Sequence, residues 1–150
     1  MQRTLVLLKP DCVQRRLIGA LMQRFEQKGL RLVGLKFAHA SRDLAEKHYA
    51  VHKGKPFYDS LLTFLTSGPT VAIVWEGRDA VAVVRGLMGP TDGTKAAPAT
   101  IRGDFALSVQ NNLIHGSDSP ENAAAEIALW FKPEEMVKYR PTDMEWIAGT

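Results

Sequence analysis

Apolar positions along this chain follow two different periods, and each period predicts one kind of secondary structure. Short, mainly apolar runs at residues 4–8 and 70–75 favour strands, residues 31–37 are another strand candidate, and a further short strand is expected around Leu113 and Ile114. Apolar residues at helical spacing begin at Leu17 and end before Gly29, and a glycine in that position is typical of a helix C-terminus. Capping residues and prolines mark the other helices, which are expected at residues 41–49, 57–65 and 79–88 and from residue 120 to about 131.

The order of these elements resembles a ferredoxin-like βαββαβ sandwich, an α/β fold of the α+β type with a four-stranded antiparallel sheet and added helices. Alternating strands and helices are also typical of a doubly wound parallel sheet. The strands are short, however, and no glycine-rich turn follows the first one. The ferredoxin-like arrangement is therefore favoured.

The chain of 150 residues is 45% hydrophobic and 23% charged, a balance that can fill the core of one domain. We expect residues 1–150 to form that single domain, with a C-terminal tail at about 133–150. The tail contains Trp146, which is seldom found in a free tail, so it is expected to pack on the body or on a neighbouring subunit. Residues 89–103 are rich in Gly, Pro, Thr and Ala without a period, which predicts a long, functional loop.

Composition also bears on location and on partners. No apolar run approaches the roughly 18–20 residues of a membrane-spanning helix, no signal peptide is visible, and the single Cys12 suits a reducing compartment. A cytoplasmic protein without a membrane partner is therefore expected. The net charge is +3, but twelve of the nineteen Lys and Arg residues are spread singly or in pairs between residues 3 and 55. No specific nucleic-acid partner is expected, although a mild positive bias attracts a small polyanion.

The four histidines differ in their settings. His48 and His52 have the i, i+4 spacing of a zinc pair, but neither the glutamate of the metalloprotease pattern nor a third ligand accompanies them. Both are therefore expected to lie on the surface, and His39 is expected to end a strand. His115 follows a short apolar strand and precedes a Gly-Ser-Asp-Ser-Pro turn, a position from which a side chain can face a cleft.

Neither a hydrolase triad nor a glycine-rich phosphate loop fits the sequence. Ser117 and Asp118 lie too close to His115 along one turn to align as a triad, and the Gly-x-Ser-x-Gly pattern is absent. The glycine-rich phosphate-binding patterns are absent as well, so a nucleotide would need side-chain ligands. The candidates are Lys9, Arg85, Thr91 and Arg102. Taken alone, each arginine is most simply a surface charge, and Lys9 is most simply a solubilising charge at the end of a strand.

An octad at residues 112–119, Asn-Leu-Ile-His-Gly-Ser-Asp-Ser, resembles the signature of nucleoside diphosphate kinases. Further segments resemble the same family in the same order, and together they cover nearly the whole chain. They are Thr4 to Asp11, His48-Tyr49, Lys55-Pro56-Phe57, Ser67-Gly68-Pro69, Thr-Ile-Arg-Gly-Asp-Phe at 100–105 and Glu-Ile-Ala-Leu-Trp-Phe at 126–131. The joint match is specific, and it outweighs the interpretation of the single residues as surface groups.

The resemblance implies an enzyme that moves the γ-phosphoryl group of a nucleoside triphosphate to a nucleoside diphosphate by a ping-pong mechanism, with broad base and sugar specificity, and so maintains nucleotide pools. His115 matches the histidine that carries the phosphoryl group on Nδ1. Glu126 matches the carboxylate that holds the other ring nitrogen, and Ser117 resembles the residue that supports this pair. A neutral imidazole nitrogen near pH 7 is both available and nucleophilic.

The resemblance also implies how the nucleotide is held. The implied binding set is Lys9, Tyr49, Phe57, Arg85, Thr91, Arg102, Val109 and Asn112. The arginines and the threonine match phosphate ligands, whereas the lysine, the tyrosine and the asparagine match the set around the sugar hydroxyl and the γ-phosphate. Lys9 and Tyr49 complete the implied catalytic set. Phe57 resembles the aromatic residue that stacks on the base, with Val109 on the other side. Mg²⁺ is expected to arrive on the phosphates, with no ligand from a protein side chain.

The implied partners are ATP and other nucleoside di- and triphosphates, together with copies of the same chain in a homohexamer or, alternatively, a tetramer. Three positions depart from the family pattern. Cys12 and Ala99 stand where glycine is common, and Gly93 stands where proline is usual. All three affect loop conformation rather than a matched catalytic side chain.

Two other functions compete with the kinase interpretation. A ferredoxin-like domain can bind single-stranded nucleic acid on its sheet, but this needs exposed aromatics on the central strands, and these strands are rich in Val, Leu, Ile and Ala. A phosphocarrier would share the phosphohistidine and serve a protein partner, whereas Phe57 and the arginine pair favour a nucleotide.

Overall fold

The computed structural model describes residues 1–149 and contains a four-stranded sheet in the order β2-β3-β1-β4. The strands are β1 (Gln2–Leu8), β2 (Arg31–His39), β3 (Pro69–Gly77) and β4 (Ile114–Gly116). Every neighbouring pair in this order is antiparallel. The predicted ferredoxin-like architecture is therefore confirmed, and the doubly wound parallel sheet is excluded.

β1 lies inside the sheet and supplies apolar side chains to both faces. Val6 and Leu8 belong to one core, and Leu5 and Leu7 belong to the other, because successive side chains of a strand alternate between its faces. β1 pairs with β3 from end to end, whereas β4 pairs with β1 only near the end of that strand. In this short pairing His115 lies opposite Leu7, so the sheet itself fixes the backbone of His115.

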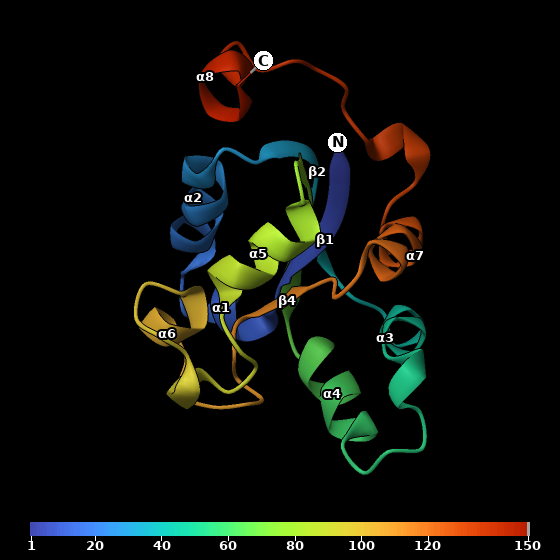
Figure 1. Ribbon diagram of the computed structural model, residues 1–150. Coiled ribbons are helices and arrows are strands. Elements are labelled where there is room, and N and C mark those ends of the chain that lie inside the picture. The colour runs from blue at the N-terminus through green and yellow to red at the C-terminus, as the bar shows by residue number, and fades with distance from the viewer. Residues whose placement is uncertain (150) are drawn as a thin grey trace.

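Helices cover both faces of the sheet (Figure 1). One face carries α1 (Pro10–Gln14), α2 (Ile18–Lys28), α5 (Ala80–Met88) and α6 (Ile101–Phe105). The other face carries α3 (Arg42–His48), α4 (Tyr58–Leu65) and α7 (Pro120–Trp130). The remaining helices are η1 (Ala50–His52), η2 (Gly93–Lys95), η3 (Pro133–Glu135) and α8 (Met144–Ala148). Among the residues described, no helix is both long and apolar enough to cross a membrane.

Local sequence signals set the ends of several helices. The side chains of Ser41, Thr100 and Ser119 each accept a backbone N–H in the first turn of α3, α6 and α7, respectively. α2 ends at Gly29, whose φ of 101° lies in the left-handed region that glycine adopts without strain. The expected start of α3, the expected end of α2 and the expected cap of α7 are thus confirmed.

The segment at residues 89–103 differs from the prediction of an irregular loop. It contains η2 and the first part of α6. The cap at Thr100 and the fully buried Ile101 anchor α6 to the core. Ile101 and Phe105 are the apolar residues of this five-residue helix, and two positions are too few to establish a helical period in the sequence.

The three departures from the family pattern occupy tightly packed or strained positions. Cys12 is fully buried in α1, and burial, together with the charge of Asp11, raises the pKa of its thiol to about 12. Gly93 lies against the backbone of Ala106, which leaves no room for a Cβ atom at position 93. Ala99 has a φ of 77°, in the left-handed region.

The tail beyond residue 132 crosses from α7 to α2 and ends in α8 (Figure 1). The N–H of Val137 donates to the carbonyl of Val33 over 2.8 Å, and the side chain of Ile147 lies against Gly29. Trp146 itself is 85% exposed in the single chain. Burial of this tryptophan against a neighbouring subunit therefore stays a prediction.

Candidate active site

Residues from five distant parts of the sequence surround one cavity of about 580 Å³. The predicted residues that line it are Lys9, Tyr49, Phe57, Arg85, Thr91, Arg102, Val109, Asn112 and His115. The cavity is also lined by His52, Ser60, Leu61, Gln110, Ile114 and Gly116. The whole predicted nucleotide-binding set is thus brought together. Ser117 and Glu126 are not part of this lining, and Glu126 lines an adjoining cavity of about 490 Å³ that shares Arg85 and His115 with it.

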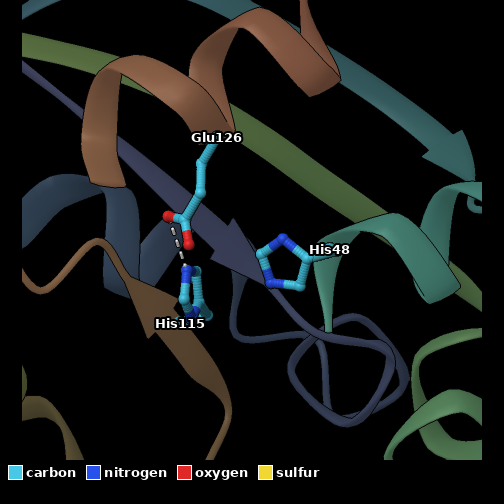
Figure 2. A group of neighbouring side chains, drawn as sticks. All are labelled: His48, His115 and Glu126. Atoms are coloured by element: carbon cyan, nitrogen blue, oxygen red, sulfur yellow. Dashed lines mark hydrogen bonds and ion pairs between the residues drawn. The ribbon is translucent and has the colours of Figure 1, made fainter. Parts of the chain in front are cut away.

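His115 is held by a carboxylate on one side of its ring. Its Nε2 lies 3.0 Å from Oε1 of Glu126, on α7 (Figure 2). The hydroxyl of Ser117 donates to the same oxygen over 2.5 Å. Because a carboxylate only accepts hydrogen bonds, Nε2 carries a proton in this arrangement. In the neutral ring, Nδ1 is then the nitrogen with a free lone pair.

Opposing effects act on the Glu126 carboxyl. Burial favours its protonated form, but the hydrogen bond and the charge of His115 and the hydrogen bond of Ser117 together hold its pKa below the ordinary value. Glu126 is therefore ionised at neutral pH. A negative charge at this place stabilises positive charge that develops on the His115 ring.

His48 is not the surface residue that the sequence predicted. It is 9% exposed, and its ring meets the ring of His115 edge to face, with centroids 4.6 Å apart (Figure 2). Burial, and then the charge of His115, lower the pKa of His48 to about 3, so its ring is neutral at physiological pH. The prediction was wrong because packing of α3 against α7 buries this position, and spacing along one helix does not report contacts with another. His52 is partly buried and lines the cavity.

His48, His115 and Glu126 bring three possible metal-ligand atoms within 4.8 Å of one another. The hydrogen bond made by Trp130 opposes use of this group as a metal site. Nε1–H of Trp130 donates to Nδ1 of His48 over 3.2 Å, so the proton of the neutral His48 ring is on Nε2. A protonated Nε2 has no lone pair for a metal, so His48 cannot act as a ligand in this arrangement, and the group does not fit a metal site with three protein ligands.

One end of the cavity, formed by Lys9, Arg102, Asn112 and His115, is here called the closed end. Nζ of Lys9 donates to the side-chain oxygen of Asn112, and Nδ2 of Asn112 donates to the carbonyl of Thr91 over 3.0 Å. Arg102 is buried, and its guanidinium donates to the carbonyls of Gly89, Asn112 and Ile114 over 3.1, 3.3 and 2.6 Å. The side chains at this end are fixed before any ligand arrives.

The closed end is electropositive. Burial is the main cause that lowers the pKa of Lys9 to about 8, with Asp11 acting to raise it and Arg102 to lower it. Burial and the neighbouring Arg85 lower the pKa of Arg102 to about 10. Both groups carry a positive charge at neutral pH, and the described residues that line the cavity include no carboxylate. An anion is therefore the complementary ligand.

Tyr49 contributes a hydroxyl to the same cavity from the end of α3. Burial, and then the charge of Glu126, raise the pKa of Tyr49 to about 12. The hydroxyl keeps its proton at neutral pH, so it can act as a hydrogen-bond donor to a ligand.

The exposed part of the cavity wall, formed by Phe57 and Val109, is here called the open end. Phe57 is 47% exposed and Val109 is 57% exposed. The Phe57 ring lies 5.3 Å from the His52 ring, measured between centroids, and Nζ of Lys55 lies 5.8 Å from the Phe57 centroid. Two exposed apolar groups beside a charged cavity suit a flat aromatic ligand.

Sequence reasoning missed two residues near this cavity. His52 was set aside together with His48, although its place beside Tyr49 and the Lys55-Pro56-Phe57 segment was a signal that it could lie near a ligand. Asp11 belongs to a segment that carried the family resemblance but received no role. In the structure its carboxylate accepts the backbone N–H of Leu113 over 3.0 Å, close to Asn112 and His115.

Comparisons with known proteins agree with this geometry. The sequence model of the family described as nucleoside diphosphate kinase matches residues 2–136. The nucleoside diphosphate kinases of Carboxydothermus hydrogenoformans and Thermosynechococcus vestitus are each 56% identical over 147 residues, covering 98% of this chain and 99% and 98% of theirs. The structure of a halophilic nucleoside diphosphate kinase from Halobacterium salinarum in complex with CDP has a TM-score of 0.95 at 50% identity, covering 97% of each chain. A nucleoside diphosphate kinase family protein from Babesia bovis has a TM-score of 0.96 at 45% identity, covering 98% of this chain and 99% of the other.

Proposed function

The chain belongs to the nucleoside diphosphate kinase family, and from this premise we propose that His115 is the residue that carries the phosphoryl group. The chain is a phosphotransferase that acts on nucleotides, and the family works by a ping-pong mechanism through a phosphohistidine. The observation that supports His115 most directly is its orientation. Glu126 holds Nε2 at 3.0 Å, and the same ring lines the cavity that contains Arg85 and Arg102.

The chemistry follows from the state of the His115 ring. The lone pair of Nδ1 attacks the γ-phosphorus, the bond to the oxygen between the β- and γ-phosphates breaks, and the diphosphate leaves with that electron pair. The ring then carries positive charge, which the Nε2–H bond to Glu126 offsets. In the second half-reaction a terminal oxygen of another diphosphate attacks the phosphorus, and the P–N bond breaks.

The closed end stabilises the negative charge of the group in transfer. Arg102 supplies a fixed positive charge there, and outside the closed end the exposed Arg85 adds a second charge and Thr91 a hydroxyl, so their roles as phosphate ligands follow from chemistry as well as from the family pattern. Lys9, Tyr49 and Asn112 lie together with them in the wall of the cavity, where their donors suit the γ-phosphate and a sugar hydroxyl. The positioned donors need no rearrangement during the reaction.

A divalent metal is usual for kinases, and we propose Mg²⁺ bound to the nucleotide as part of the substrate. The described residues of the cavity wall offer cations, hydroxyls and amides but no carboxylate. Mg²⁺ prefers oxygen ligands and retains several waters, so phosphate oxygens and water would complete its coordination.

At the open end we propose that Phe57 stacks on one face of the base and Val109 contacts the other. Apolar contacts to the faces of a base discriminate little among bases, because every base has a π-face. This arrangement supports broad base specificity, with broad sugar specificity following from the family pattern, and a role in the maintenance of NTP and dNTP pools.

We further propose that the chain acts in the cytoplasm as one domain and assembles as a homohexamer, with a tetramer as the alternative. The single chain exposes Leu35 and Phe37 on the edge strand β2, and it also exposes Trp146 and Ile147 on α8. Large apolar side chains at a sheet edge and on a tail are suited to contacts between copies. Analytical ultracentrifugation distinguishes a hexamer from a tetramer and a monomer.

The proposed function is tested by phosphorylation in two steps. ATP labelled at the γ-phosphate, with Mg²⁺, is expected to give an acid-labile, base-stable phosphate on His115, and unlabelled GDP is expected to remove it. His115→Ala should abolish both the label and the exchange, while the control His39→Ala, a change in an exposed histidine on β2, should retain both. Label or exchange that persists in His115→Ala contradicts the assignment.

A further inference from the structure

The backbone turns through a strained residue two positions before His115. Leu113 has a φ of 74°, in the left-handed region, although its side chain is a leucine that is fully buried. A bulky residue rarely adopts this conformation, and when one does, other contacts must hold it there. The question is therefore which contacts hold Leu113.

The start of α1 holds both polar groups of Leu113. The carboxylate Oδ2 of Asp11 accepts the Leu113 N–H over 3.0 Å, and the backbone N–H of Lys9 donates to the Leu113 carbonyl over 2.9 Å. The bond from the Lys9 N–H is a backbone bond, so it does not depend on the side chain at position 9. The bond from the Leu113 N–H, in contrast, requires the carboxylate of Asp11. Loss of that acceptor would leave a buried N–H without a partner.

The residues on either side of Leu113 are the ones that must be placed accurately. Asn112 precedes it and meets the side chain of Lys9. Ile114 follows it and begins β4, opposite Leu8 of β1, and His115 is the next residue. The conformation of Leu113 thus sets the path of the backbone from Asn112, which is the hydrogen-bond partner of Lys9, to the nucleophile His115.

We propose that Asp11 is a positioning residue for phosphoryl transfer, because its carboxylate holds Leu113 in the left-handed conformation that places Asn112 and His115 in the cavity. This inference rests on the proposed role of His115 as the phosphoryl carrier. Asp11 does not line the cavity, so it acts through the backbone and not by contact with the nucleotide.

The useful property of Asp11 is the position of one acceptor oxygen and not the charge. Asp11→Asn keeps an acceptor oxygen at the same distance from the backbone and removes the charge. Asp11→Glu keeps the charge and moves the oxygens farther along the side chain. Asp11→Ala removes the acceptor altogether. The matched control is Asp43→Ala, which deletes an exposed aspartate from the first turn of another helix, α3.

The decisive measurement is the rate of His115 phosphorylation by Mg²⁺–ATP in a single turnover, together with the Kd for GDP. Asp11→Ala and Asp11→Glu should phosphorylate about tenfold to a hundredfold more slowly, because small displacements of a reacting group have large effects on rate. The Kd for GDP should change by less than the rate. At a pH well below the pKa of Lys9, which the charge of Asp11 acts to raise, Asp11→Asn and Asp43→Ala should phosphorylate within about threefold of the wild type.

Two results would overturn the inference. One is a wild-type rate in Asp11→Ala. The other is a rate in Asp11→Asn as low as that in Asp11→Glu or lower, which would show that charge and not the acceptor matters. If Asp11→Ala fails to fold, the test still stands on which of Asp11→Asn and Asp11→Glu phosphorylates His115 faster. Failure of the wild type itself to form a phosphohistidine contradicts the proposed function instead and is seen without any Asp11 variant.

Discussion

At the closed end of the cavity the functional side chains are buried and bonded to the backbone, whereas at the open end they are exposed and bonded to little. Arg102 alone donates to three carbonyls, and Asn112 is held from both sides by Lys9 and by the carbonyl of Thr91. Phe57 has about half of its surface exposed, and its hydrogen bonds are made by its backbone carbonyl, which accepts the Ser60 hydroxyl and the Leu61 N–H. In the proposed function, the closed end thus supplies positioned donors for the phosphoryl group in transfer, whereas the open end supplies a surface for the base.

The two ends also differ in backbone strain. At the closed end, Leu113, which lies between Asn112 and Ile114, is a non-glycine residue with a φ of 74°. In the segment just before Phe57, the residue with a left-handed backbone conformation is Gly54, with a φ of 87°. Glycine adopts this conformation without strain. Strain that surrounding contacts maintain is found where reacting groups must be placed accurately. This contrast predicts that substitutions at the closed end change rates and stability, and that those at the open end change affinity.

Arg102→Ala is expected to have the largest effect. Loss of one fixed charge at the transferring group should lower kcat by on the order of 10²–10³. The same change removes the donors of three backbone carbonyls, so the free energy of unfolding should fall by about 3 kcal/mol. Steady-state kinetics and chemical denaturation measure the two effects.

Arg85→Ala separates the effect of lost charge on the rate from the effect of lost backbone hydrogen bonds on stability. The Arg85 guanidinium donates to one carbonyl, that of Gly116, over 3.2 Å. We expect a similar loss of rate with a smaller loss of stability. Arg78→Ala, a change at an exposed arginine, is the control for removal of charge alone. If Arg102→Ala retains wild-type stability, the closed end is not fixed by its arginine in the way described.

The second prediction concerns pH. Lys9 has a pKa of about 8 because burial disfavours its charged form, so in the free enzyme it loses its proton as the pH rises through 8. The charge it contributes to phosphate binding is present below this value and lost above it. The profile of kcat/KM, which reports the free enzyme, should therefore fall about tenfold per pH unit above pH 8.

Lys9→Arg checks the origin of this fall. Arginine stays charged across the range, so the variant should lose activity at neutral pH through altered geometry but should not show the decline centred near pH 8. An unchanged alkaline limb in Lys9→Arg would assign the titration to another group.

Phe57→Ala should have a smaller effect, confined to affinity. Stacking on an aromatic ring contributes about 1–3 kcal/mol per base, and half of this ring is exposed, so we expect about a tenfold rise in Kd. The rise should be equal for ADP, GDP and CDP, with kcat nearly unchanged, as measured by calorimetry and kinetics. Leu107→Ala removes an exposed apolar side chain outside the cavity and should leave Kd unchanged. A loss for one base only would reveal edge contacts that the stacking proposal lacks.

The elements could be predicted because their signals are local. The run at residues 4–8, the glycine after α2 and the serine before α7 each act within a few residues, and the four strands follow in the expected order. His115 was the histidine singled out by its place after a strand, and the family resemblance supplied the residues that now line the cavity with it.

What sequence reasoning missed depends on contacts between distant segments. The burial of His48 results from α7, more than seventy residues further along the chain, and its hydrogen bond from Trp130 comes from the same helix. The left-handed φ of Leu113 has no signature, since leucine usually avoids that region. The acceptor that holds it, Asp11, lies about one hundred residues earlier, and no spacing rule connects the two.

The smallest predicted effect distinguishes strain that serves the site from strain that does not. Ala99 is exposed, and its carbonyl and N–H bond to Arg24 and Asp104 rather than to residues of the cavity wall. Ala99→Gly should therefore relieve the left-handed strain, raising the free energy of unfolding by about 0.5 to 1 kcal/mol and the Tm by about 2 to 4 °C, after the added entropy of the unfolded chain is included. Activity should stay at the wild-type level. The matched control, Ala124→Gly in the exposed interior of α7, should instead lower stability by about 1 kcal/mol. A loss of activity in Ala99→Gly would mean that the conformation at residue 99 also positions Arg102, and that strain is used throughout the closed end and not only at Leu113.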